Sequence, residues 1–287
     1  MYKRQVFYHV ANTLSFSEAS KQLFISQSAV SQSIKVLEKK LNQPLFIRST
    51  KRVQLTPEGE ILLKHIEPAM NLIKQGENQL LEANTLNGGQ LRIGASDTIC
   101  RYYLIPYLKE FHRKYPNVHI KVTNQTSIAC AKLLESGQVD FAITNYPNSG
   151  LSNTQNVRII HEFHDVFAAN DEYGSLRGKT VTLKELQTCP ILMLDRKSTT
   201  SEFLHSMFQR HQLDLVPEIE LSSNELLIDL ARIGLGIAFV PDYCIPENDP
   251  DLFIVHLEEQ LPARQMVVAY NENIPLSQAA RQFIDML

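Results

Sequence analysis

Cysteines and long apolar runs are both scarce in this sequence. The 287 residues include four cysteines, which stand far apart at Cys100, Cys130, Cys189 and Cys244. This spacing predicts neither a disulfide framework nor a metal site, and inert thiols are a simpler interpretation than a redox sensor. No stretch approaches the roughly 18 apolar residues that span a bilayer, and the N-terminus lacks the apolar run of a signal peptide. We therefore expect a cytoplasmic protein that does not enter a membrane.

Catalytic signatures are missing as well. The sequence has no G-x-S-x-G elbow, no H-E-x-x-H helix and no G-x-G-x-x-G loop. The run GLGIAFVP at residues 234–241 lacks the Lys-Ser/Thr pair of a phosphate-binding loop, and its apolar residues predict a buried strand. His161 and His164 alone do not make a metal site. We expect no catalytic residues, no bound metal and no cofactor.

Charge is distributed unevenly along the chain. Residues 1–56 contain nine Lys or Arg and two acidic residues, a net charge of +7. Because the whole chain carries −3, residues 57–287 carry −10. A basic segment joined to an acidic body indicates nucleic-acid binding confined to one end. The hydrophobic content of 44% is that of a globular protein, and a chain of this length holds two or three compact units.

Residues 15–35, SFSEASKQLFISQSAVSQSIK, have the pattern of two short helices separated by a tight turn. Ser15 and Glu18 fit a capping box, in which the hydroxyl and the carboxylate each accept from a free backbone N–H. Ser26 is placed to cap the second helix. Apolar side chains at helical spacing are expected to face inward. They are Ala19, Leu23 and Phe24 in the first helix, and Ala29, Val30, Ile34, Leu37 and Leu41 in the second.

The second of these helices presents Gln, Ser and Lys side chains on its outer face. Such a face suits the major groove of DNA, because Gln pairs with adenine through two hydrogen bonds and Ser bonds either base type. The positions expected to read or approach bases are Gln27, Ser28, Ala29, Ser31, Gln32 and Lys35. An ordinary polar surface helix would explain the same composition.

Residues 44–56, PLFIRSTKRVQLT, are typical of two short strands around a basic tip. Phe46 and Ile47 supply the first strand, and Val53 and Leu55 supply the second. A basic hairpin next to a base-reading helix is the wing of a winged helix-turn-helix, where cations meet phosphates. The residues expected to hold phosphates or enter the minor groove are Arg48, Thr50, Lys51 and Arg52.

The stretch VFYHVANTLSFSEASKQLFISQSAVSQSIKVLEKKLNQPLFIRSTKRVQLTPEGE resembles the N-terminal domain of LysR-type transcriptional regulators. The similar motifs, in order, are F-x-x-V-A, S-F-S-E-A-S, S-Q-S-A-V-S-Q-S-I-K-x-L-E, L-F-x-R and L-T-P-E-G-E. The resemblance implies a winged helix-turn-helix domain over residues 1–56 that binds double-stranded promoter DNA. In that family the first helix usually has a few more residues, including a Leu, before the position of Phe7, so the resemblance leaves open whether residues 1–5 are the natural start.

A long linker helix is predicted over residues 57–87, with Thr56 as its cap and Pro57 in its first turn. Apolar residues in alternating steps of four and three form the seam of a coiled coil. The positions expected to mediate dimerisation are Leu62, Ile66, Ala69, Ile73 and Leu80. Pro68 should kink this helix, and packing of the seam against the same chain is the alternative. The resemblance implies a homodimer, and dimers that pair into a tetramer.

Residues 88–287 alternate between strand and helix patterns. The order strand, helix, strand, helix, strand occurs in two sets and predicts mostly parallel sheets covered by helices. The fold class is therefore α/β, with two Rossmann-like lobes after the winged helix-turn-helix and the linker helix. Lobe I is expected at about residues 88–163 and 270–287, and lobe II at about 164–269. The resemblance implies an effector-binding domain built like a periplasmic solute-binding protein.

Three loops carry hydroxyl side chains at the ends of predicted strands. Ligands bind there in such sheets, because helix N-termini point free N–H groups at that edge. The residues expected to bind an effector are Ser96, Thr98, Thr126, Ser127, Ser198, Thr199 and Thr200. Each also suits a plain helix cap, but three facing loops favour a pocket. Asp97 would repel an anion unless it faces solvent or pairs with Arg101, or unless Arg196 and Lys197 compensate, so we expect a small polar metabolite and leave its charge open.

Together these patterns predict a transcriptional regulator whose hold on promoter DNA is modulated by a small molecule in the cleft between two lobes. The expected partners are DNA, the effector, a second copy of the chain and RNA polymerase. Two alternatives stay open at this point. An enzyme with an appended DNA-binding segment lacks recognisable catalytic residues, and a solute-binding module without DNA function does not explain the basic N-terminal segment.

Overall fold

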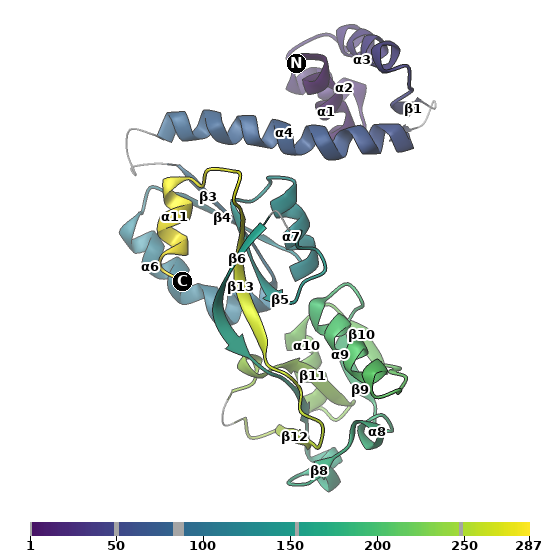
Figure 1. Cartoon of the computed structure of the whole chain (residues 1–287), viewed down its shortest axis with the longest axis vertical. Helices are drawn as coiled ribbons and strands as arrows, with labels where there is room; N and C mark the ends of the chain where they lie inside the picture. The colour runs from purple at the N-terminus through teal and green to yellow at the C-terminus, as the bar shows by residue number, and fades with distance from the viewer. Residues whose placement is uncertain (1, 49–51, 83–88, 153–154, 247–248) are drawn as a thin grey trace. The chain divides into compact units, whose positions relative to one another are not determined.

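The computed structural model describes residues 2–48, 52–82, 89–152, 155–246 and 249–287 (Figure 1). The chain divides into two compact units. One comprises Met1–Asn84 and Glu135–Gln138, and the other comprises Thr85–Leu134 and Val139–Leu287. Within the described ranges, no helix is both long and apolar enough to cross a membrane.

The first unit consists of a three-helix head, a β-hairpin and a long helix (Figure 1). Its elements are α1 (Tyr2–Thr13), α2 (Phe16–Gln22), α3 (Gln27–Leu41), β1 (Phe46–Arg48), β2 (Val53–Leu55) and α4 (Pro57–Glu82). Strands β1 and β2 pair antiparallel, as a wing requires. The predicted winged helix-turn-helix is confirmed.

Serine caps set the starts of α2 and α3. Ser15 Oγ accepts from the Glu18 N–H, and Ser26 Oγ accepts from the Ala29 N–H, both at 3.2 Å. Each cap satisfies one of the backbone donors that a helix start leaves without a partner. The predicted capping box is incomplete, because the Glu18 carboxylate pairs with Lys21 at 3.3 Å instead of reaching back to the Ser15 N–H.

One apolar core holds the head together. Its fully buried members include Val6, Phe7, Val10, Ala19, Val30, Ile34, Leu37, Leu45 and Phe46. The Phe46 ring lies 5.4 Å from that of Phe7, so the wing is packed against α1. Two residues expected inside lie outside, since Phe24 is 95% exposed and Leu41 is 40% exposed. Phe24 has a φ of +53°, which turns the chain off the helical path and away from the face on which the pattern placed it.

Helix α4 begins where the sequence predicts. Thr56 Oγ1 accepts from the Gly59 N–H at 3.0 Å and donates to the Pro44 carbonyl at 2.8 Å. The cap therefore also ties the helix to the segment that leads into the wing. The helix continues through Pro68 without a break, and residues 83–87 of the predicted linker lie outside the described residues.

The second unit contains two sheets, one in each lobe. The sheet of lobe I has the order β4-β3-β5-β13-β6, with β3 parallel to β4 and β5 and with β13 antiparallel to β5 and β6. Its strands are β3 (Gln90–Ala95), β4 (His119–Asn124), β5 (Phe141–Tyr146), β6 (Gln155–Phe163) and β13 (Arg264–Asn271). Its helices are α5 (Asp97–Ile99), the π-helical turn Cys100–Leu104, α6 (Ile105–Lys114), α7 (Ser127–Glu135) and α11 (Gln278–Ile284).

The sheet of lobe II has the order β10-β9-β11-β7-β12-β8. Its strands are β7 (Asp165–Ala169), β8 (Thr180–Val181), β9 (Ile191–Leu194), β10 (Ile219–Leu221), β11 (Ile237–Pro241) and β12 (Phe253–Leu257). Its α-helices are α8 (Leu183–Leu186), α9 (Thr199–Arg210) and α10 (Asn224–Arg232), and short 3-10 turns span Asp171–Leu176 and Asp242–Cys244. Strands β9, β10 and β11 are parallel, as the alternating pattern predicts.

The boundary between the lobes differs from the prediction at one strand. The sequence pattern assigns residues up to 269 to lobe II. In the structure β13 pairs with β6 along its whole length and with β5 over Gln265–Ala269, so Arg264–Asn271 belongs to the sheet of lobe I. A run of apolar residues marks a buried strand but does not say which of two sheets will receive it.

Candidate functional site

The candidate DNA-binding surface lies on the first unit, along α3. Gln27, Ser28, Gln32 and Lys35 are exposed, whereas Ala29 and Ser31 are half-buried. The first turn of α3 contains no acidic residue, which suits an approach to phosphates. Of the wing residues predicted to contact DNA, Arg52 is exposed, Arg48 is described only by its backbone, and Thr50 and Lys51 lie outside the described residues.

Glu38 links this helix to the wing. Its Oε1 accepts from the backbone N–H of Leu45 at 2.9 Å and from that of Phe46 at 3.3 Å. These two donors lead directly into β1, so the carboxylate sets where the hairpin starts relative to α3. The sequence pattern did not reveal this role, because Glu38 stood out only as one of two acids in a basic segment.

The predicted dimerisation residues of α4 fall into two groups. Leu62 and Ile66 contact the apolar core of the head, and Ile66 is only 6% exposed. Ala69 is exposed, Ile73 is half-buried and Leu80 is 78% exposed. The first pair packs within its own chain, and a role of the remaining three in dimerisation stays a prediction.

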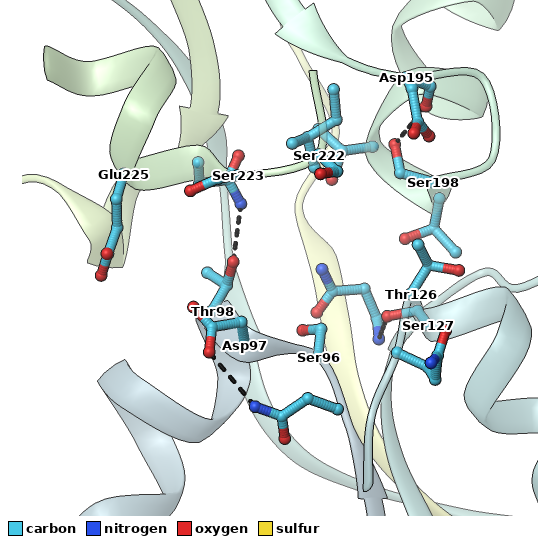
Figure 2. Close-up of a pocket in the computed structure, with 17 residues that line it drawn as sticks. Ser96, Asp97, Thr98, Thr126, Ser127, Asp195, Ser198, Ser222, Ser223 and Glu225 are labelled. Atoms are coloured by element: carbon cyan, nitrogen blue, oxygen red, sulfur yellow. Dashed lines mark hydrogen bonds between the residues drawn. The ribbon is translucent and has the colours of Figure 1, made fainter.

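A cavity of about 270 Å³ lies between the two lobes of the second unit (Figure 2). All seven residues predicted to bind an effector line it. The sequence reasoning missed further lining residues, which are Asn124, Gln125, Asn145, Leu194, Asp195, Ser222, Ser223, Asn224 and Glu225. A signal for part of this set was present, because Ser223 and Asn224 follow a predicted strand and precede a predicted helix, as the three recognised loops do.

Four helices begin at this cavity, and a hydroxyl caps each of them. The capping residues are Ser96 of α5, Thr126 of α7, Ser198 of α9 and Ser223 of α10. Each accepts from the N–H three residues further on, at 3.1–3.3 Å. Of the seven residues predicted to bind an effector, Ser96, Thr126 and Ser198 are therefore helix caps, and this role is compatible with binding, since the other first-turn N–H groups still lack helical acceptors.

Several polar contacts join the lobes at the cavity, and one of them is a hydrogen bond between two lining residues. Asn224 Nδ2 of lobe II donates to Thr98 Oγ1 of lobe I at 3.0 Å (Figure 2). On the wall of lobe I, Ser127 Oγ accepts from the Asn145 N–H at 3.2 Å. Thr199, which is 4% exposed, completes the wall at the start of α9.

A buried ion pair joins the lobes next to the cavity. Arg264 Nη1, on β13, lies 2.7 Å from Asp165 Oδ2, on β7, and both side chains are almost fully buried. Burial raises the pKa of Asp165, and the neighbouring guanidinium opposes this shift. The same Nη1 donates to Thr200 Oγ1 at 3.1 Å. Because Thr200 lines the cavity, the cavity wall is connected directly to the pair.

The charge of the cavity is acidic. Its described lining residues include three carboxylates and no Lys, Arg or His. Asp97 is exposed and does not pair with Arg101, because Arg101 Nε lies 2.5 Å from Glu225 Oε1. Arg196 and Lys197 are exposed and do not line the cavity, so neither compensates Asp97 there.

Among the described residues, neither the cysteines nor the side chains able to ligate a metal form a second candidate site. All four cysteines are free, and burial raises the pKa of Cys100 to about 11 and that of Cys130 to about 12. Both thiols therefore stay protonated near neutral pH, the unreactive form. The described part of the chain has no group of three or more His, Cys, Asp or Glu placed to hold a metal ion.

Comparison with known proteins agrees with this architecture. Residues 3–60 match the family described as bacterial regulatory helix-turn-helix protein, lysR family. Residues 84–287 match the family described as LysR substrate binding domain. A probable RuBisCO transcriptional regulator from Gracilaria tenuistipitata var. liui is 30% identical over 277 residues, which cover 94% of this chain and 89% of that protein.

Two solved structures share the fold. Full-length OxyR from Pseudomonas aeruginosa, in a variant with one cysteine replaced by aspartate, has a TM-score of 0.73 and 19% identity, covering 99% of this chain and 92% of its own. The CcmR regulatory domain of Synechocystis PCC6803, in complex with 2-PG, has a TM-score of 0.63 and 23% identity, covering 69% of this chain and 95% of its own.

The two family matches together span the head, the first residues of α4 and both lobes, and they leave residues 61–83 unmatched. They confirm the resemblance that the N-terminal motifs carry. This chain therefore belongs to the LysR family of bacterial regulators, DNA-binding proteins with an effector-binding domain, and it is a transcriptional regulator and not an enzyme.

Proposed function

We propose that the cavity between the lobes binds a small polar metabolite, and that its occupation changes how the chain acts on promoter DNA. The observation that carries this proposal is the convergence of hydroxyl side chains from both lobes on one cavity. Few pockets of a protein combine such a concave site with convergent polar groups. The related CcmR regulatory domain, which binds 2-PG, supports an effector site in this domain.

The contacts between the lobes supply a route for the change. The hydrogen bond from Asn224 to Thr98 crosses the cavity, and the Arg264–Asp165 pair joins the two lobes next to it. A ligand that binds one arrangement of the lobes more tightly shifts the population toward that arrangement. Helix α4 connects this domain to the head in sequence, so it is the element through which a change would reach the DNA.

On the DNA side, we propose that α3 reads bases and that the wing holds phosphates. Gln27, Ser28 and Gln32 would contact base edges, and Lys35 and Arg52 would contact the backbone. The exposed apolar residues of α4 would pair two chains, so that two heads match a two-fold operator, and dimers would pair into tetramers. Such a regulator acts in the cytoplasm, and a contact with RNA polymerase would complete its mechanism.

A ligand screen on a matched pair of variants tests the effector site. Thr199→Val keeps the branched shape of the side chain and removes one hydroxyl from the cavity wall, and Thr180→Val makes the same change at an exposed position of β8. In thermal-shift measurements with a panel of polar metabolites, we expect a compound that raises the Tm of the wild type and of Thr180→Val. The same compound should raise the Tm of Thr199→Val clearly less. A shift that is equal in all three proteins would place the ligand elsewhere.

A further inference from the structure

This inference rests on the proposed function, that the cavity binds an effector. The charges and hydrogen-bonding groups of the lining side chains then indicate which class of molecule binds there. Asp97, Asp195 and Glu225 line it, and no cationic side chain does so among the residues described. Arg101 neutralises Glu225 from outside the lining. A dianion such as a phosphorylated acid would meet two carboxylates without a side-chain cation to pair with it, an unfavourable arrangement at short range.

Two buried carbonyl oxygens at the cavity lack hydrogen-bond donors. Asn145 and Asn224 are 7% and 5% exposed, and the Oδ1 atom of neither accepts a hydrogen bond, although the Asn145 amide lies beside the Tyr243 hydroxyl. The Nδ2 of Asn224 is already used, because it donates to Thr98. A buried acceptor without a partner is costly, so these two atoms favour a ligand that brings N–H or O–H donors.

The opposite side of the cavity favours an acid group. Thr126 and Ser198 cap α7 and α9, and Ser127 begins α7. The backbone N–H groups of two helix starts and the surrounding hydroxyls bind a carboxylate without a cationic side chain. In Figure 2 these residues lie on the other side of the cavity from Asp97 and Glu225, and Asp195 lies beside Ser198 on the same side, where its Oδ1 accepts from the Lys197 N–H at 3.0 Å.

We propose that the effector is a small zwitterion, an amino acid or a close amine-bearing acid. Its carboxylate binds at the starts of α7 and α9. Its ammonium group donates toward Asp97 and toward the amide oxygen of Asn224. An ammonium supplies three donors and one positive charge, so it satisfies the buried acceptor of Asn224 and pairs with the carboxylate of Asp97. A neutral polyol would supply donors alone.

Pairs of probes that differ only in the amine test this assignment. The common amino acids are compared with 2-hydroxy acids of the same skeleton, such as alanine with lactate, serine with glycerate and aspartate with malate. Thermal shift on the full chain identifies binders, and calorimetry measures their affinity. We expect at least one amino acid to raise the Tm and to bind at least tenfold more tightly than its hydroxy-acid counterpart.

Asp97→Asn should weaken the binding of that amino acid about two- to fivefold, which is the range of a solvent-exposed charge pair. It should leave the affinity for the hydroxy acid unchanged. Asp214→Asn removes the same charge at an exposed position outside the cavity lining and should change neither affinity. If no amino acid shifts the Tm, or if the shift persists unchanged in both Asp97→Asn and Thr199→Val, the zwitterion assignment is wrong. A different outcome is that hydroxy acids, phosphorylated acids or polyols raise the Tm of the wild type but not that of Thr199→Val. In that case the cavity remains the effector site, and only the proposed class of ligand is wrong.

Discussion

Glu38 and Thr56 each join two segments of the head through one side chain. The carboxylate of Glu38 accepts from the two N–H groups that lead into β1. The hydroxyl of Thr56 caps α4 and donates to the Pro44 carbonyl. Both contacts fix the wing beside α3, which leaves the outer side chains of that helix available for DNA.

Two single substitutions separate base reading from phosphate binding. Gln32→Ala should relax the preference for one base pair by about 1–3 kcal/mol, because a bidentate contact to a base edge is lost. Arg52→Ala should weaken binding to all sequences similarly and lower the salt slope by about one. Fluorescence anisotropy with a set of single-base operator variants at several salt concentrations measures both effects. Identical losses from the two substitutions on every duplex would mean that the assigned roles are wrong.

The buried pair of Arg264 and Asp165 predicts a large stability effect. Asp165→Ala should lower the free energy of unfolding by about 3–5 kcal/mol, because it leaves a buried guanidinium without its counter-charge. Asp171→Ala breaks the exposed pair with Arg177 and should cost less than about 1 kcal/mol. Urea unfolding followed by circular dichroism compares the two variants. Equal costs would show that the buried pair contributes no more than a surface contact.

At the scale of elements, the start of α3 depends on one serine. Ser26→Ala removes the cap of the Ala29 N–H and should cost about 1 kcal/mol, which corresponds to roughly fivefold faster hydrogen exchange in the first turn of α3. Ser33→Ala, in the middle of the same helix, should not speed exchange, because alanine favours helix. Hydrogen exchange measured by mass spectrometry on peptides that cover residues 26–36 distinguishes them. Unchanged exchange in Ser26→Ala would contradict the capping role.

The elements that the sequence pattern predicts are those with strong apolar periodicity. Strands β3, β5, β9 and β11 are largely buried, and each appears as a short apolar run. Strand β6 carries no such signal, because it lies at a sheet edge and most of its residues are at least partly exposed. Strands β8 and β12 are short or half-exposed and carry little signal. The assignment of β13 to a sheet depends on tertiary pairing, which periodicity does not contain.

The residues of the candidate site also divide into those that the sequence predicts and those that it does not. Hydroxyls that follow a strand and begin a helix were predictable, since both the cap and the sheet edge have a sequence signal. Asn124 and Asn145 were not predictable, because they are the last or next-to-last residues of strands and their direction depends on register. The partner of Arg101 was not predictable either, because Glu225 reaches it from the other lobe, 124 positions further along the chain.

At the scale of the whole molecule, the exposed part of α4 predicts self-association. Leu80 is 78% exposed, and packing of its side chain against a second copy of the chain would explain an apolar residue at this position. Leu80→Glu should raise the dimer dissociation constant at least tenfold in sedimentation experiments, because it would bury a charge in the seam. Val216→Glu changes an apolar residue of lobe II that is 81% exposed and should leave the dimer intact. A monomeric wild type, or equal effects of both substitutions, would argue against the seam.

The central claim is that the basic head is the part of the chain that binds a specific DNA sequence. The most direct measurement is the affinity of the purified protein for a duplex selected from random sequences, compared with a scrambled duplex of the same composition, between 50 and 200 mM salt. We predict binding to the selected duplex that is at least about a thousandfold tighter and that weakens steeply as salt increases. Equal affinity for the two duplexes, or no binding to either at low salt, would contradict the claim.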